Sequence, residues 1–120
     1  MNGILWILQF IVAITFLYSG INKSIYSERK LVERGQTGVE GLPLTLIRFI
    51  GRSEILGSMG LILPSLLHLF PVLTVISAIC LAIIMIPAAL IHYRRNEPKN
   101  ILTNAILFLM CVFIAYGRSI

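Results

Sequence analysis

The charged residues of this 120-residue chain are clustered, and they leave three long stretches without Asp, Glu, Lys or Arg. These stretches cover residues 1–22, 55–93 and 100–117. A helix needs about 20 mostly apolar residues to cross a bilayer, because each residue rises ~1.5 Å through a hydrocarbon core ~30 Å thick. The first and last stretches each fit one such helix. The middle stretch has 39 residues and contains Pro64 and Pro71, so it predicts two helices joined by a hairpin at residues 64–71.

The fold class follows from the continuity of these apolar stretches, which do not alternate with the period of two that is typical of barrel strands. We predict an all-α integral membrane protein, a single domain over residues 1–120. Its four transmembrane helices form an antiparallel bundle at residues 3–22, 44–63, 72–91 and 100–117. Composition agrees, since 58% of the residues are apolar and only 12% are charged. A soluble chain of this length lacks enough charged surface to cover so many apolar residues.

The basic residues of the loops predict one orientation in the cell membrane. The loops at residues 23–43 and 92–99 lie on the same side and hold seven of them, against Arg118 alone on the other side. The seven are Lys23, Arg29, Lys30, Arg34, Arg94, Arg95 and Lys99. The positive-inside rule places both loops in the cytoplasm and both termini outside. This topological role accounts for the net charge of +5, and we expect no nucleic-acid partner.

The first loop has two parts of different composition. Residues 24–34 mix apolar and charged side chains, which predicts a short helix lying at the headgroups. Residues 35–41 contain three glycines, which favours a flexible tether over a lid or a ligand contact.

One carboxylate lies deep in the second predicted helix and requires an explanation. An ionisable group at the bilayer centre costs roughly 2.5–3.5 kcal/mol on insertion scales. Arg48 and Arg52 are four residues apart and share a face, whereas Glu54 lies roughly 200° around the helix from Arg52. Glu54 shares its face with small residues such as Gly51 and Gly57, and small residues mark helix contacts in membranes. We therefore expect Glu54 to point into the bundle.

The other helices place polar residues at the same depth. Lys23 ends the first helix, His92 ends the third, and Asn104 lies about one turn into the fourth. Tyr18 belongs to a polar stripe that leads along the first helix to Lys23. Two interpretations stay open: a hydrogen-bond network that fixes helix register, or a ligand, substrate or proton site built on Glu54. The candidate site residues are Tyr18, Lys23, Arg48, Glu54, His92 and Asn104.

Four segments of the chain resemble the DoxX-like family of small four-helix membrane proteins. They are residues 18–23 (Tyr-Ser-Gly-Ile-Asn-Lys), 48–64, 92–97 and 116–118. The resemblance implies a four-helix fold, with Lys23, Arg48, Glu54 and His92 matching the family's polar pattern. Relatives of this kind include a membrane subunit of a thiosulfate:quinone oxidoreductase and components of oxidative-stress membrane complexes. A quinone is therefore an implied cofactor, and a membrane oxidoreductase an implied partner.

The leading functional interpretation is an accessory subunit or small-molecule binder in the lipid bilayer, linked to quinone or redox chemistry. We expect no independent enzyme activity, because the sequence has no metal-ligand cluster, nucleophile–base pair or phosphate-binding glycine loop. The alternatives are a small proton-coupled transporter and a non-catalytic membrane assembly factor. Stripes of small residues at positions 53, 57 and 60 and at 78 and 82 also suit a homo-oligomer.

Overall fold

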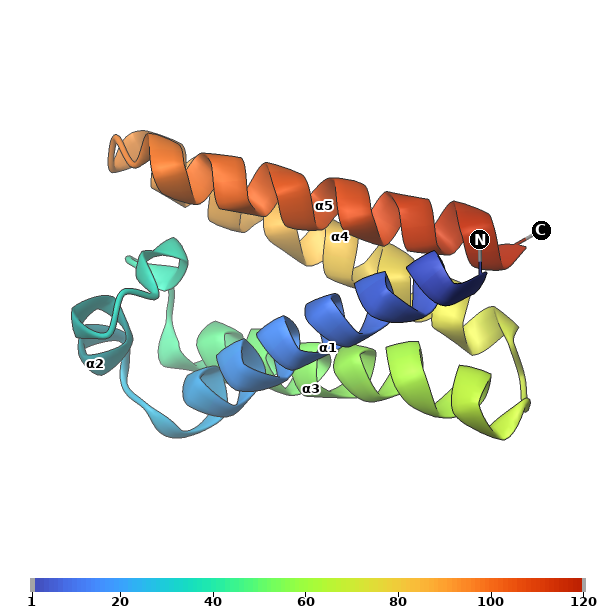
Figure 1. Ribbon diagram of the computed structural model, residues 1–120. Helices are drawn as coiled ribbons and strands as arrows, with labels where there is room; N and C mark the ends of the chain where they lie inside the picture. The colour runs from blue at the N-terminus through green and yellow to red at the C-terminus, as the bar shows by residue number, and fades with distance from the viewer. Residues whose placement is uncertain (1, 120) are drawn as a thin grey trace.

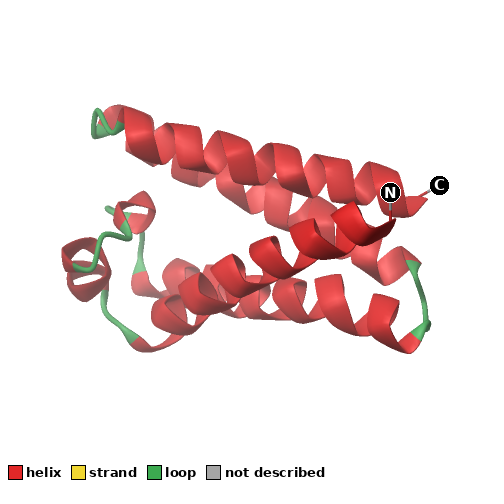
Figure 2. Cartoon of the chain, in the orientation of Figure 1, coloured by secondary structure: helices red, strands yellow, loops and turns green. Residues whose placement is uncertain are grey.

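A computed structural model describes residues 2–119 as an all-α protein, and these residues include no β-strand (Figure 2). The predicted all-α class is therefore confirmed. The long helices are α1 (Asn2–Ile25), α3 (Leu44–Leu67), α4 (Val72–Arg94) and α5 (Pro98–Ser119). Two short elements lie between α1 and α3: helix α2 (Glu28–Glu33) and the 3-10 helix η1 (Thr37–Val39). Ser27 caps α2, because its side-chain oxygen accepts a hydrogen bond from the Lys30 amide.

The four long helices run in alternating directions and form two close pairs, α1 with α3 and α4 with α5 (Figure 1). Helix α3 also packs on α4, whereas α1 and α5 share the smallest contact of these four neighbouring pairs. Apolar residues from all four, including Val12, Leu61, Leu81 and Ile114, fill the centre. We call the end of the bundle that carries α2, η1 and the α4–α5 loop the covered end. The opposite end, where the two chain ends lie, is the terminal end (Figure 1).

Three of the long helices, α1, α4 and α5, are long and apolar enough to cross a membrane. Helix α3 has 24 residues, as many as α1, but its first half carries Arg48, Arg52 and Glu54. Large apolar side chains cover the outside of the bundle; Ile14 is 66% exposed and Leu56 is 69% exposed. Such an apolar surface is typical of protein that faces lipid. The helices and their surface are therefore those of a membrane protein.

The helices extend beyond several of their predicted ends. Helix α1 continues to Ile25 rather than residue 22, and α3 continues to Leu67 rather than residue 63. Pro64 is tolerated inside α3 because its missing N–H removes only one backbone hydrogen bond near the helix end. The chain leaves α3 at His68, whose φ of 54° is left-handed and whose N–H donates to the Pro64 carbonyl. The connection to α4 is shorter than predicted for this reason.

Helices α1 and α3 approach each other closely at Gly20 and Gly51. A Cβ atom at Gly20 would lie 2.6 Å from the Gly51 carbonyl oxygen, which is closer than real Cβ atoms come to another atom. The absence of side chains here lets the two backbones meet, as small residues commonly do in membrane helices. The contact brings Ser19 and Lys23 of α1 beside Glu54 of α3.

We predict that Gly20→Ala destabilises the protein by about 1–3 kcal/mol, because the added methyl group must push α1 away from α3. Gly3→Ala is the matched control on the same helix, since a Cβ there would meet no atom within 4 Å. The thermal unfolding midpoint in detergent micelles measures both changes. Equal midpoints for the two variants would show that the Gly20–Gly51 contact is not a tight one.

Candidate functional site

Glu54 forms a buried ion pair with Lys23 at the centre of the α1–α3 contact. The Lys23 Nζ atom lies 3.1 Å from Glu54 Oε2, and the two side chains are 11% and 2% exposed. Ser19 Oγ donates a 2.9 Å hydrogen bond to the other carboxylate oxygen. Glu54 points into the bundle as expected, and of the polar residues at its depth Lys23 is the one that pairs with it. A paired carboxylate is far less costly in an apolar bundle than an isolated one.

The ion pair lines a cavity of about 250 Å³ that reaches all four long helices and η1. Phe16, Ile50, Met85 and other apolar side chains form much of its wall. Polar side chains also border it: Thr15, Tyr18, Ser19, Lys23, Gln36, Glu54, His92, Asn100, Thr103 and Asn104. Apolar walls with a few placed polar groups are the usual construction of small-molecule sites.

Residues 28–42, which we call the cover, close this cavity at the covered end. Leu31 of α2, Val39 of η1 and Ile47 of α3 are all buried and form a small apolar core of their own. The prediction of a flexible tether over residues 35–41 is therefore wrong. Gly35 and Gly41 have φ values of 90° and 83°, so these glycines form the two left-handed turns on either side of η1. At these positive φ values a residue with a Cβ would be strained, so the two glycines allow the turns of a packed segment.

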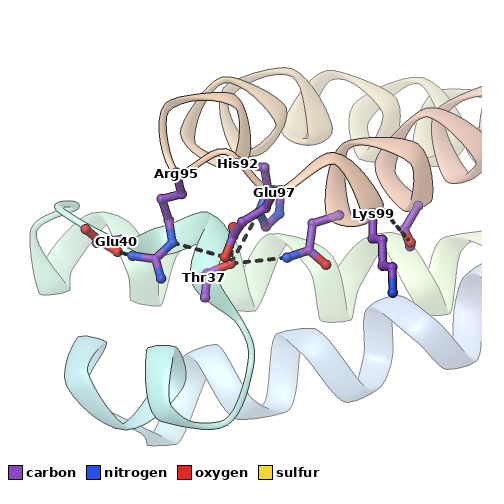
Figure 3. A network of polar contacts seen from close by, with 8 residues as sticks. Thr37, Glu40, His92, Arg95, Glu97 and Lys99 are labelled. Carbon is purple, nitrogen blue, oxygen red and sulfur yellow. Dashed lines mark hydrogen bonds and ion pairs between the residues drawn. The ribbon is translucent and has the colours of Figure 1, made fainter.

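A polar network fixes the cover to the α4–α5 connection (Figure 3). The Thr37 hydroxyl donates a 2.7 Å hydrogen bond to Glu97, and His92 Nδ1 lies 2.9 Å from the same carboxylate oxygen. Arg95 pairs with Glu97 and with Glu40 of the cover. Hydrogen bonds from His92 and Thr37 lower the pKa of the Glu97 carboxyl to about 2. Glu97 is therefore ionised over the physiological pH range, and it accepts from both neighbours.

The predicted site residues have different positions around the cavity. Glu54, Lys23, His92, Asn104 and Tyr18 all line it, although Tyr18 is 60% exposed and lies at the rim. His92 was expected near Glu54, but it pairs with Glu97 because the turn after α4 brings that carboxylate back to it. Asn104 presents a buried Nδ2 atom that has no hydrogen-bond partner among residues 2–119.

Arg48 does not face the cavity. Its Nη1 atom donates to the backbone carbonyl oxygens of Lys23, at 2.8 Å, and of Tyr26, at 2.6 Å. These oxygens belong to the end of α1, where a helix leaves its last carbonyls unpaired. A cation there is also favoured by the negative end of the helix dipole. Arg48 therefore holds the end of α1 in place and does not join the cluster around Glu54.

Sequence reasoning missed the cover's contribution and a second buried polar residue. Gln36 lines the cavity, and Thr37 of η1 contacts His92 on the cavity wall, but nothing in their local sequence indicates a site. Gln9 of α1 is fully buried, and its Nε2 atom donates to the Leu61 carbonyl oxygen at 2.5 Å. Arg118 of α5 donates to the Gln9 side-chain oxygen at 2.6 Å. Gln9 precedes the polar stripe that leads to Lys23, and the signal for it was a lone amide in the otherwise apolar first half of the first predicted helix.

The fold and the cavity together define a small, all-helical membrane protein with a polar site inside its bundle. Residues 7–114 match the DoxX-like family. Because this match covers nearly the whole chain, the protein belongs to the DoxX-like family, and the resemblance is confirmed. No curated protein and no solved structure shows significant similarity to the chain. The function must therefore be inferred from the cavity itself.

We predict that Lys23→Met destabilises the protein by about 3–5 kcal/mol, because it leaves a buried carboxylate without its partner. The double variant Lys23→Met/Glu54→Leu should regain most of this loss, since it removes both charges. Arg29→Met is the surface control, because the Arg29–Glu33 pair is exposed and such pairs contribute about 0–1 kcal/mol. Denaturant titration in micelles measures all three. Equal losses of unfolding free energy in the single and double variants would show that the unpaired carboxylate is not the cause of the destabilisation.

Glu97→Gln should loosen the cover. The Glu97 pKa is lowered from 4.5 to about 2. The ionised carboxylate therefore makes its full contribution to the stability of the closed cover above pH 4.5. That contribution is lost as pH falls toward 2. Hydrogen exchange of residues 35–41 should rise in Glu97→Gln at neutral pH. In the wild type, protection corrected for intrinsic exchange should persist at pH 5.

Glu33→Gln supplies the control for this experiment, because within residues 2–119 Glu33 pairs only with the exposed Arg29. Unchanged exchange in Glu97→Gln, or an equal rise in Glu33→Gln, would contradict the role of Glu97 in holding the cover.

Proposed function

We propose that the chain crosses the cell membrane four times, with α3 as the fourth span. Three features support this topology. Helix α3 is as long as α1, its deepest charge is neutralised by Lys23, and Arg48 bonds to backbone oxygens at the end of α1. The basic residues of the loops favour a cytoplasmic covered end, which leaves both termini outside. The cavity then lies in the cytoplasmic half of the bilayer.

We propose further that the protein binds a small lipophilic molecule in this cavity. The observation that carries the proposal is the buried Lys23–Glu54 pair on the wall of an otherwise largely apolar cavity. A network that served only helix register would be expected to fill its own space, because protein interiors pack densely. Here about 250 Å³ beside the pair is left for another molecule. The apolar walls would hold the body of the ligand and the polar side chains would orient its head.

The residues of the cavity fit the head of a quinone, the cofactor that the family resemblance implies. A ring would lie among apolar side chains such as Phe16 and Met85, and its carbonyl oxygens would accept hydrogen bonds from donors such as Lys23 and Asn104. The bound quinone would supply electron-transfer chemistry; the chain's own residues would hold it and exclude water. We propose an accessory role beside a membrane oxidoreductase, the partner that the family resemblance implies, with the chain as a homo-oligomer.

Native mass spectrometry of the mildly solubilised protein tests this proposal. The wild type should carry a defined adduct, and Glu54→Gln should lose most of it because the carboxylate no longer positions the Lys23 ammonium group. Glu33→Gln, on the exposed face of α2, should keep the adduct. Circular dichroism establishes that each variant is folded. An adduct that survives Glu54→Gln, or the absence of any adduct from the wild type, would refute a ligand site built on Glu54.

A further inference from the structure

The cavity is bordered by α1 and α5, a helix pair that separates along its length. At the terminal end α1 and α5 are held together, because Gly117 packs against Leu5 and Arg118 donates to both Gln9 and Asn2. From there the two helices diverge toward the covered end (Figure 1). Their contact is also the smallest among the neighbouring long helices. The pair therefore forms a wedge that is closed at the terminal end and wider beside the cavity.

Part of the rim of the cavity lies in this wedge; Pro87 of α4 and Gly35 of the cover also line the cavity and are exposed. Thr15 and Tyr18 of α1 and Thr103 of α5 all line the cavity, and all three have exposed side chains. Side chains that are both exposed and lining mark the place where a cavity reaches the surface. In a membrane this surface faces the acyl chains, so the opening leads sideways into lipid. The cover lies over the aqueous end of the cavity and is fastened there by Thr37 and Glu40.

Size and charge restrict what can occupy the site. A cavity of about 250 Å³ is below the ~300–1,000 Å³ that is usual for whole small ligands. It accommodates a head group, and an attached chain must leave through the wedge. The two charged side chains on the wall, Lys23 and Glu54, already neutralise each other. A charged head would enter this site without a free counter-ion, and burial of an unpaired charge is costly.

Two side chains on the cavity wall each have a polar atom without a hydrogen-bond partner among the described residues. The Asn104 side chain lines the cavity, and its Nδ2 atom is shielded and has no partner among residues 2–119. An unsatisfied donor is costly unless it turns toward a ligand or water that completes it. His92 Nδ1 must carry a hydrogen, because it faces the Glu97 carboxylate, which only accepts. This leaves His92 Nε2, which lies toward Gly38 on the cavity wall. An oxygen-bearing head can accept from Asn104 and contact His92.

We propose that the cavity takes the uncharged, oxygen-bearing head of a single-chain lipid, which enters from the bilayer between α1 and α5 and accepts a hydrogen bond from Asn104. This inference rests on the proposed ligand-binding function and adds to it the class of ligand, the donor that selects the head and the route of entry.

Three probes with the same saturated chain test the head group: 1-dodecanol, dodecanoate and dodecylamine, which are uncharged, anionic and cationic at neutral pH. Native mass spectrometry of the full chain in nanodiscs should give an affinity for 1-dodecanol at least about tenfold above that for either charged probe. Asn104→Leu should weaken binding of 1-dodecanol about tenfold, the usual effect of losing one buried hydrogen bond. Preference for a charged probe, or no binding of any probe, would overturn the inference.

Asn22→Leu is the matched control for Asn104→Leu. Asn22 also has a buried, unpaired Nδ2 atom, but it does not line the cavity. Its substitution should leave binding of 1-dodecanol unchanged, and unfolding midpoints check that both variants are folded. Equal effects of the two substitutions would overturn the role of Asn104. If Glu54→Gln removes the natural adduct while Asn104→Leu leaves 1-dodecanol bound as in the wild type, this inference fails and the proposed function stands.

The route is tested by a bulky residue in the wedge. Thr103→Trp should slow uptake of 1-dodecanol from nanodisc lipid about tenfold or more, because the indole fills the opening. Leu102→Trp, at the next residue of α5, is the control, since Leu102 is 61% exposed and does not line the cavity. If Thr103→Trp leaves uptake unchanged while Glu97→Gln accelerates it, the ligand enters through the cover and the proposed route is wrong.

Discussion

The buried contact between Lys23 and Glu54 determines how the rest of this bundle is organised. A carboxylate in the middle of a membrane helix must have a partner, because neither lipid nor an apolar core can solvate its charge. The partner comes from α1, and it reaches Glu54 only because Gly20 and Gly51 let the two backbones approach. Helices α1 and α3 are thereby joined into one unit. The other pair, α4 and α5, packs against this unit and encloses the cavity on its remaining sides.

The two ends of the bundle are held by polar interactions of different kinds. At the covered end, Glu97 accepts hydrogen bonds from Thr37 and His92 and so fastens η1 over the cavity. At the terminal end, Arg118 and Gln9 fasten α5 to α1. Between these ends the α1–α5 contact is small. The arrangement leaves a largely apolar cavity that lies beneath the cover and beside the least tightly packed of the neighbouring helix pairs.

Some polar residues around the cavity are paired within the chain and stabilise the fold, whereas others have no partner in the chain. Lys23, Glu54 and Glu97 have partners within the chain, so their charges are already compensated. Asn104 Nδ2 has none among residues 2–119. Charge compensation explains how so polar a site is tolerated inside a membrane protein, and the unpaired amide gives it a donor for an uncharged group.

The sequence alone determined the four long helices, because apolar stretches of spanning length and the charges between them are local properties. It also determined that Glu54 faces inward, because helical periodicity and the small residues beside Glu54 are visible in one segment; that Lys23 is its partner was decided by the structure. It did not determine that Arg48 binds backbone carbonyl oxygens, because this contact depends on where α1 ends in space. Nor did it determine the pairing of His92 with Glu97 across a turn. The cover was misjudged because glycines predict conformational freedom, whereas Gly35 and Gly41 here form fixed turns around a packed η1. Only the tertiary structure decided these points, since each depends on contacts between residues that are distant in sequence or on backbone angles that neighbouring elements impose.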